Sequence, residues 1–276
     1  MITIFTVPKP FTDKHVNIIQ RNAIGSWLRL IPSVEIILIG NEHGVAEISK
    51  EFGLKHIPNV KVSEYGTPLL DSVFQLASEN TENEILIYSN SDIIFSNSVV
   101  NILKNPSMGK FLLVGRRTDV EIENEINFND PSWKNEVFDK IISRGKLHSP
   151  YGIDYFIFQK ENLPKLPGMA VGRIGWDNWM IWNAKKKNLR LIDCTESIMA
   201  IHQNHTYPSF NIGAERKSNP EAVKNLSFLK GMTRDYSIED ADWIMKDGKI
   251  IKKSLNSRFF RTARKTLREI RRFLGL

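Results

Sequence analysis

The sequence holds a single cysteine among its 276 residues, and none of its apolar runs approaches the length needed to span a bilayer. With only Cys194 the chain cannot form an internal disulfide, which fits a reducing compartment. The first residues, Met1 to Phe5, have no basic lead, and Pro8 follows soon after, so we expect no signal peptide. These absences predict a soluble or peripheral protein located in the cytoplasm.

Two common nucleotide-binding motifs are also missing. No Gly-x-Gly-x-x-Gly follows the first predicted strand, at residues 2–7, and the chain has no Walker-type lysine in a glycine-rich loop. A dinucleotide-binding or P-loop protein would be expected to carry one of them. Their absence argues against both of these classes.

Net positive charge is nearly absent from the body of the chain, where 31 basic residues meet 30 acidic ones. Residues 256–276 carry seven basic residues and one acid, so they supply +6 of the net charge of +7. Their apolar residues recur mostly every three or four positions, which predicts a basic amphipathic helix over 251–276. Such a helix suits an anionic membrane surface. Packing on the body or on another subunit is the alternative, and nucleic acid is not expected because no recognisable binding domain adjoins the tail.

Apolar runs and helical patterns alternate through the first half of the chain. Strands are expected at residues 2–7, 34–39, 54–60 and 85–88, and helices at 13–31, 42–52 and 68–78. Strands separated by helices predict βαβ units, and therefore an α/β fold with a mostly parallel central sheet flanked by helices.

The second half of the chain has a less regular pattern. Strands are expected at residues 111–114, 152–159, 189–192 and 198–201, with the last two taken as the final strands, and helices at 131–143 and 176–187. Residues 119–130 are acidic and predict a loop. Residues 206–250 show only weak periodicity and give no assignment.

The triplet Asn90-Ser91-Asp92 closes the apolar run at 85–88 and precedes a second short run at 93–95. A buried strand that ends in polar residues delivers them to the carboxyl edge of a sheet, where α/β proteins bind ligands. A carboxylate in that position suits a hard cation such as Mg²⁺ on phosphate oxygens. An ordinary turn is the competing interpretation, because Asn, Ser and Asp all favour turns.

With the triplet, several later motifs make the chain resemble a GT-A glycosyltransferase of the bacterial family-2-like group that builds cell-surface polysaccharides. The resemblance covers about residues 1–205 and rests on these segments: 6–10 (TVPKP), 66–71 (GTPLLD), 90–92 (NSD), 152–155 (GIDY), 175–178 (GWDN) and 202–205 (HQNH). It implies a Rossmann-related fold and transfer of a sugar from a UDP- or GDP-sugar, with Mn²⁺ or Mg²⁺. Asn90 departs from the Asp-x-Asp pattern of these enzymes, and an amide there should weaken metal binding.

The resemblance assigns the metal to Asp92 and to a late histidine, for which His202 is preferred over His205. A helix cap at Asp92 and a hydrogen-bonded structural histidine are the alternatives. Asp177 is the candidate general base, because an inverting transfer must remove the proton of the acceptor hydroxyl. Its alternative role is a cap at the start of a helix.

The remaining candidate residues would contact the substrates, and each also has an ordinary capping, core or turn explanation. The nucleotide is expected at Thr6, Pro8, Arg21, Asn41, Thr67, Asp71, Asn90 and Ser91. The donor sugar or the acceptor is expected at Asp154, Trp176, Arg116 and His205, with Arg117 as the other arginine of its pair.

The predicted organisation is one transferase domain over residues 1–250, with a nucleotide-binding half at 1–115 and an acceptor half at 116–250, followed by the tail helix at 251–276. The expected partners are a nucleotide-sugar, a glycan or lipid-linked acceptor and the inner face of a membrane. Two alternatives are a degenerate, non-catalytic nucleotide-sugar or glycan-binding protein and a sugar nucleotidyltransferase. The nucleotidyltransferase is disfavoured because residues 6–11 lack the glycine-rich basic loop that it needs.

Overall fold

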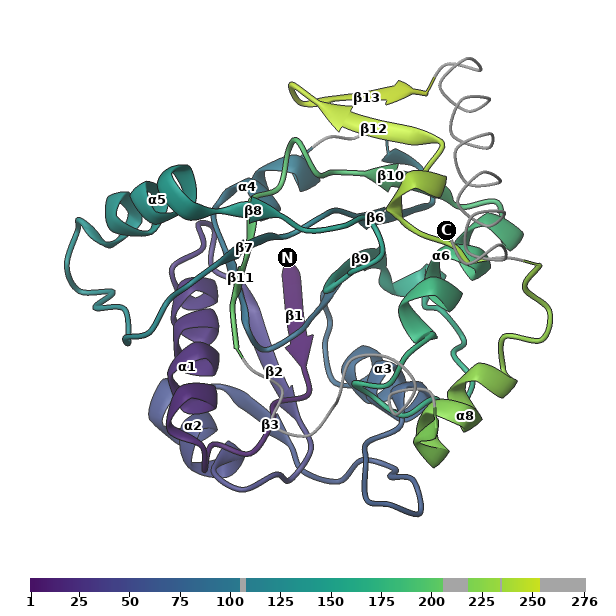
Figure 1. Ribbon diagram of the computed structural model, residues 1–276, viewed down its shortest axis with the longest axis horizontal. Helices are drawn as coiled ribbons and strands as arrows, with labels where there is room; N and C mark the ends of the chain where they lie inside the picture. Colours follow the sequence, from purple (N-terminus) through teal and green to yellow (C-terminus); the bar gives the residue numbers. More distant parts are fainter. Residues whose placement is uncertain (105–107, 206–217, 234, 254–276) are drawn as a thin grey trace.

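A nine-stranded sheet crosses the centre of the computed structural model, which describes residues 1–104, 108–205, 218–233 and 235–253 (Figure 1). In spatial order its strands are β13 (Lys249–Lys252), β12 (Trp243–Lys246), β10 (Arg190–Asp193), β6 (Phe111–Val114), β9 (Tyr155–Gln159), β4 (Ile85–Ser89), β1 (Ile2–Thr6), β2 (Glu35–Ile39) and β3 (Lys55–Ile57). Five of its eight strand pairings are parallel. The predicted α/β fold with a mostly parallel central sheet is confirmed.

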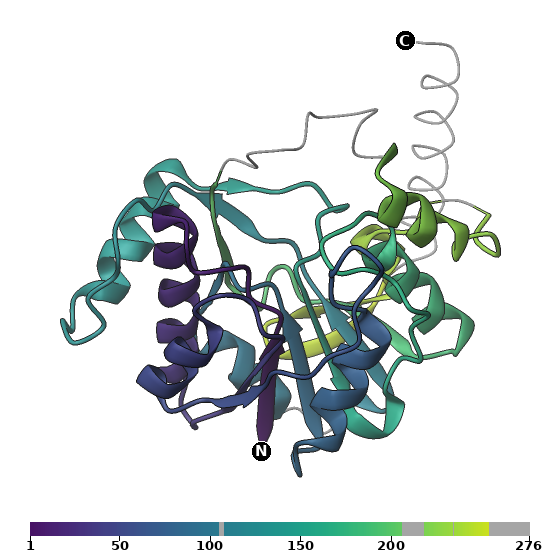
Figure 2. The same ribbon diagram turned by 90° about the horizontal axis from the view of Figure 1, so that it is seen from below.

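Helices cover both faces of this sheet (Figure 2). The helices α1 (Lys14–Leu28) and α2 (Val45–Phe52) pack on one face, and α3 (Leu70–Glu79) and α6 (Trp176–Lys186) pack on the other. Successive side chains of a strand point to opposite faces, so Ile4 joins the first core and Phe5 joins the second. Strands buried on both faces explain the nearly continuous apolar runs in the sequence.

The second core contains a cluster of aromatic rings. Phe74 of α3 lies between the sheet residues Phe5, Tyr88 and Phe158, with ring centroids 5.1 to 5.6 Å apart. All four side chains are at most 1% exposed. Burying a ring of this size contributes about 1.5–3 kcal/mol. The cluster therefore fixes α3 against β1, β4 and β9, the strands that lead to the sheet edge described below.

A second, four-stranded sheet lies beside α1 and carries part of the candidate site. Its order is β5 (Ile93–Phe95), β11 (Ala200–Gln203), β7 (Thr118–Val120) and β8 (Lys146–Leu147), and α5 (Trp133–Arg144) packs against it. The remaining short elements are α4 (Ser98–Asn101), η1 (Ile102–Lys104), η3 (Lys160–Asn162), α8 (Pro220–Ser227) and η4 (Ile238–Asp240). The loop predicted at 119–130 was wrong at its start, because residues 119 and 120 belong to β7 and pair with β11.

The prediction that the chain has its last strands at 189–192 and 198–201 was also wrong. The hairpin of β12 and β13 follows them and extends the large sheet. Its turn consists of Asp247 and Gly248, which both have positive φ angles, of 48° and 69°. An Asp-Gly pair between two apolar runs is a typical hairpin signal. The weak periodicity of residues 206–250 obscured it.

The predicted tail helix lies almost entirely outside the described residues, which end at 253, and residues 251 and 252 belong to β13. Within the part of the chain that the structure describes, every helix is too short or too polar to cross a bilayer.

Candidate functional site

The polar triplet lies at the edge of the large sheet that the sequence predicted. Strands β1 and β4 are parallel, with Phe5 beside Tyr88, and their carboxyl ends reach this edge together. Strand β9 runs antiparallel to β4, with Tyr155 beside Ser89. The start of β9 therefore meets the end of β4, and Asp154 lies next to Asn90, whose N–H donates to the Asp154 carbonyl at 2.8 Å.

Asp92, His202 and His205 converge at this edge. Strand β11 pairs antiparallel with β5, which places His202 opposite Ile93, the residue after Asp92. His205 Nε2 lies 3.1 Å from Asp92 Oδ2, and His202 Nε2 lies 3.8 Å from the same oxygen. The three side chains can each present one donor atom, with all three atoms within 4.8 Å of one another. Two candidates separated by 110 residues in the sequence, Asp92 and His202, thus come together.

The protonation states favour cation binding. Burial alone would raise the pKa of the Asp92 carboxyl, but the hydrogen bond from His205 and the interactions with His202 and Lys9 outweigh burial and lower that pKa to about 2. Burial lowers the pKa of His202 from its usual value, although Asp92 acts in the opposite direction. At neutral pH the site therefore offers a carboxylate and a neutral imidazole, the forms that bind metal ions.

Three atoms in this group are buried without a hydrogen-bond partner among the described residues, namely Asp92 Oδ1, His202 Nδ1 and His202 Nε2. Buried polar atoms are normally satisfied, so orphaned atoms on two residues of this group point to a bound group. One carboxylate and two imidazoles form a mixed oxygen and nitrogen donor set, which suits Mn²⁺ better than Mg²⁺. The residues present therefore fit a divalent cation.

The Asn90 side chain forms a hydrogen bond with the carboxylate of Asp154. Its Nδ2 donates to Asp154 Oδ1 at 2.7 Å, and Asp154 Oδ2 accepts from Arg117 Nη1 at 2.6 Å. An aspartate at position 90 would place a second carboxylate against Asp154, and like charges at this separation repel strongly in a buried site. The amide is thus the side chain that fits beside Asp154, which explains the departure from Asp-x-Asp.

Asp119 is a site residue that the sequence analysis missed. Its Oδ1 accepts from Arg117 Nε at 2.9 Å and lies 3.1 Å from His202 Nδ1, while its Oδ2 lies 2.6 Å from His148 Nδ1. Nδ1 forms no hydrogen bond among the described residues, but the negative charge of Asp119 favours a proton on that nitrogen, which would leave Nε2 to a cation. The alternation of apolar Val120 and Ile122 with acidic residues was a local signal for a strand here, and both side chains are buried in the structure.

Ser91 and two further residues connect the triplet to the loop after β1. Ser91 Oγ donates to Gln20 Oε1 at 2.7 Å, and the Lys9 N–H donates to the same oxygen at 2.7 Å. Gln20 is 1% exposed, so this link is rigid. It holds Lys9, whose side chain is exposed, near Asp92 at the sheet edge.

The other candidate nucleotide contacts divide into two groups. Thr6 and Pro8 are buried at the carboxyl end of β1, where Thr6 Oγ1 has no hydrogen-bond partner among the described residues, and Asn41 is exposed after β2. Two others are engaged elsewhere. The Arg21 guanidinium donates to both carboxylate oxygens of Glu51, and Thr67 interacts with Glu221 of α8.

Asp71 lies in the first turn of α3, at the same end of the molecule as the loop that contains Thr67. Its Oδ1 is buried and has no hydrogen-bond partner among the described residues. Asp71 therefore has a carboxylate oxygen without a hydrogen-bond donor, and Thr6 has a hydroxyl group without a partner, among the described residues. Both residues stay candidates for contact with a ligand.

The structure separates the two residues of the predicted Arg116 and Arg117 pair. Arg116 Nε donates to the carbonyl of His148 at 2.6 Å, so its guanidinium supports the backbone near β8. Arg117 points the other way, to Asp154 and Asp119. Arg117, rather than Arg116, is therefore the cation placed beside the Asp92 group.

Trp176 and Asp177 begin α6. The Trp176 ring is 6% exposed and packs on Tyr88 and Phe156, with ring centroids 5.1 and 5.2 Å away. That burial assigns Trp176 to the core rather than to sugar stacking. It also anchors the start of α6 beside β4 and β9, so the half-buried Asp177 lies near the ends of the strands that carry Asn90 and Asp154.

Comparisons with known proteins bear on the fold. No protein-family model matches the chain, and no curated protein matches its sequence. Among solved structures, a mycobacterial protein matches with a TM-score of 0.50 at 12% identity, covering 85% of this chain and 76% of that one. The likeness shows a shared fold over most of the chain.

Two further solved structures are similar at lower scores. A Desulfovibrio desulfuricans G20 protein assigned as a nucleotide-diphospho-sugar transferase has a TM-score of 0.47 at 11% identity, covering 83% of this chain and 95% of that one. Glucosyl-3-phosphoglycerate synthase from Mycobacterium tuberculosis, in complex with Mg²⁺ and uridine diphosphate, has a TM-score of 0.48 at 13% identity, covering 85% and 80%.

Proposed function

We propose that this protein is a metal-assisted glycosyltransferase that moves a sugar from a nucleoside diphosphate, UDP or GDP, onto a glycan or lipid-linked acceptor. The observation that carries the proposal is the convergence of Asp92, His202 and His205 at the carboxyl edge of the sheet. In α/β folds that edge is where nucleotides bind.

The proposed metal site would stabilise the negative charge of the leaving group. A cation held by Asp92, His202 and His205 would neutralise the negative charge that develops on the departing diphosphate. Lys9, exposed beside the edge, adds positive charge on the same side. Asp119 and Arg117 position the group, because Asp119 faces His202 Nδ1 and Arg117 joins Asp119 to Asp154.

Asp177 is the residue that we propose accepts the proton of the acceptor hydroxyl in a single inverting displacement. Its carboxylate Oδ1 already accepts from the N–H of Asn178 at 2.9 Å, which fixes the side chain at the start of α6. In this proposal residues 1–250 act as one catalytic domain, in which residues 1–115 supply the nucleotide site and 116–250 supply the acceptor side.

The proposed function predicts that a nucleotide-sugar stabilises the full chain only together with a divalent cation. Thermal-shift measurements with UDP-, GDP-, CMP- and dTDP-sugars, each with and without Mn²⁺, should show one donor raising Tm by several degrees in the presence of the metal. A turnover assay with that donor completes the test. Nucleotide binding without turnover of any donor would indicate a non-catalytic binding protein, and no response to any of them would contradict the proposal.

We also propose that the basic tail holds the protein on the inner face of a membrane, near a lipid-linked acceptor. The proposal rests on the charge and apolar spacing of residues 256–276 in the sequence. The full chain should co-sediment with vesicles of anionic lipid at low salt and be released as salt screens the charges. A chain ending at Lys253 should stay in the supernatant, and equal sedimentation of both would show that the tail is not the anchor.

A further inference from the structure

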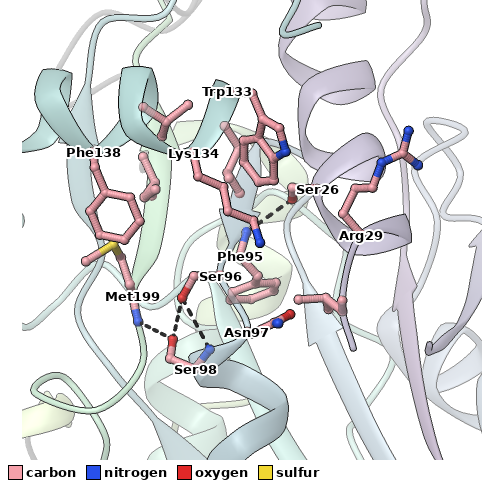
Figure 3. Close-up of a pocket in the computed structure, with 14 residues that line it drawn as sticks. Ser26, Arg29, Phe95, Ser96, Asn97, Ser98, Trp133, Lys134, Phe138 and Met199 are labelled. Carbon is pink, nitrogen blue, oxygen red and sulfur yellow. Dashed lines mark hydrogen bonds between the residues drawn. The ribbon is translucent and has the colours of Figure 1, made fainter. Parts of the chain in front are cut away.

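A cavity of about 240 Å³ opens between α1, β5, β11 and α5, and none of the residues assigned to the metal site lines it (Figure 3). It is bounded by the end of α1, the turn from β5 into α4, the outer residues of β11 and the first turns of α5. The residues that line it are Ser26, Arg29, Leu30, Ile94, Phe95, Ser96, Asn97, Ser98, Trp133, Lys134, Val137, Phe138, Met199 and Ile201.

Hydrogen bonds within the fold hold the polar wall of this cavity in place. The N–H of Phe95 donates to Ser26 Oγ at 3.2 Å, and the N–H of Met199 donates to Ser98 Oγ at 3.0 Å. The hydroxyl groups of Ser96 and Ser98 lie 2.7 Å apart and share a hydrogen bond. These bonds fasten β5 and β11 to α1 and to the start of α4. Hydrogen bonds within the protein therefore hold the walls of the cavity in place without a bound ligand.

The charge on the lining has one sign. It includes Lys134 and Arg29 and contains no aspartate or glutamate. The Lys134 ammonium contacts the Trp133 ring, 5.7 Å from its centroid, and forms no ion pair with a carboxylate in the described part of the chain. Arg29 donates to the Asn129 side-chain oxygen at 3.3 Å and forms no ion pair with a carboxylate among the described residues; both cations are exposed to solvent. An anion in the cavity could pair with both of them.

The rest of the lining is aromatic and apolar. Trp133, Phe138 and Met199 face the space between α5 and the strands, and the Lys134 side chain extends between them and Ser26 (Figure 3). The Trp133 ring is held by Phe128, with ring centroids 4.9 Å apart. Indole, phenyl and thioether groups make favourable contacts with another aromatic ring.

We propose that this cavity binds a small aromatic anion, whose ring lies against Trp133, Phe138 and Met199 and whose acid group pairs with Lys134 and Arg29. A carboxylate, sulfonate or phosphate would fit this description. The volume admits a one- or two-ring compound rather than a whole nucleotide-sugar. The site is separate from the metal group, so the proposal does not depend on the proposed transferase activity.

The test is calorimetric titration of the full chain, without metal or nucleotide, with naphthalene-1-sulfonate as the probe. We expect one equivalent to bind. Lys134→Gln and Arg29→Gln should each weaken binding about fivefold, as expected for a partly exposed ion pair. Lys140→Gln is the matched control, because Lys140 lies on the same helix outside the lining, and it should leave the affinity unchanged.

The neutral analogue 1-naphthalenemethanol should bind at least about fivefold more weakly than the sulfonate, because it lacks the charge. Equal affinities of the two probes would overturn the proposal, since the cations would then contribute nothing. Equal affinities of the Lys134→Gln and Lys140→Gln variants for the sulfonate, or the absence of any binding, would overturn it as well.

Discussion

Asp92→Asn is expected to lose binding of Mn²⁺ and, with it, metal-dependent binding of the nucleoside diphosphate and turnover. Asp92 supplies the only carboxylate in the three-residue group, and its Oδ1 is buried without a partner among the described residues. Replacing it with an amide removes the negative charge that offsets the cation. The Kd for Mn²⁺, measured by calorimetry, should rise by more than the 10–100-fold that loss of a supporting residue typically causes.

Asp119→Asn provides the graded comparison for this prediction. Asp119 does not belong to the three-residue group but faces His202 Nδ1 at 3.1 Å, so its loss should raise the Kd for Mn²⁺ by roughly 10–100-fold. Thermal denaturation without metal separates a binding defect from unfolding. If Asp92→Asn folds and binds Mn²⁺ as tightly as the parent protein, Asp92 is a structural residue and the metal assignment fails.

Asp177→Asn is expected to lower kcat by about 10²–10⁴-fold, the usual contribution of a positioned general base. Donor binding should change little, because the Asp177 carboxylate is assigned to the acceptor rather than to the nucleotide. The measurement pairs a turnover assay, with the donor found by thermal shift, with calorimetric titration of the corresponding nucleoside diphosphate and Mn²⁺. An amide preserves the shape of the side chain and a hydrogen-bond acceptor for the Asn178 N–H.

Asp242→Asn is the matched control, because Asp242 is a carboxylate just before β12 that contacts the same helix without belonging to it. Asp242 pairs with Lys185 near the other end of α6, at 2.9 Å, and its loss should leave both kcat and nucleotide affinity within about twofold of the parent protein. If Asp177→Asn loses nucleotide affinity in proportion to turnover, Asp177 stabilises the site instead of acting as the base.

The local parts of the fold could be predicted from the sequence. Buried strands with long apolar runs and helices with a clear apolar face were placed within a few residues of their observed bounds, because each pattern is set by its own neighbours. The N-cap of α1 at Asp13, whose side chain accepts from the Val16 N–H at 2.8 Å, is one such signal. The position of Asn90-Ser91-Asp92 followed from the same local reasoning.

The contacts within the site could not be predicted in the same way, because they depend on pairing between distant segments. His202 reaches Asp92 only because β11 pairs with β5, and Asp119 reaches His202 only because β7 pairs with β11. Arg116 and Arg117 are adjacent, so their side chains point in opposite directions, and the sequence alone does not show which one points to the site. The partner of Asn90, Asp154, likewise comes from an antiparallel strand that the pattern of parallel units does not reveal.

Pulsed electron paramagnetic resonance of the Mn²⁺-loaded full chain tests the metal centre most directly. We expect one bound Mn²⁺ with magnetic coupling to imidazole nitrogen, a coupling that weakens in His202→Ala and in His205→Ala. A Mn²⁺ signal without nitrogen coupling, or with coupling that survives both substitutions together, would show that the cation does not bind at Asp92, His202 and His205.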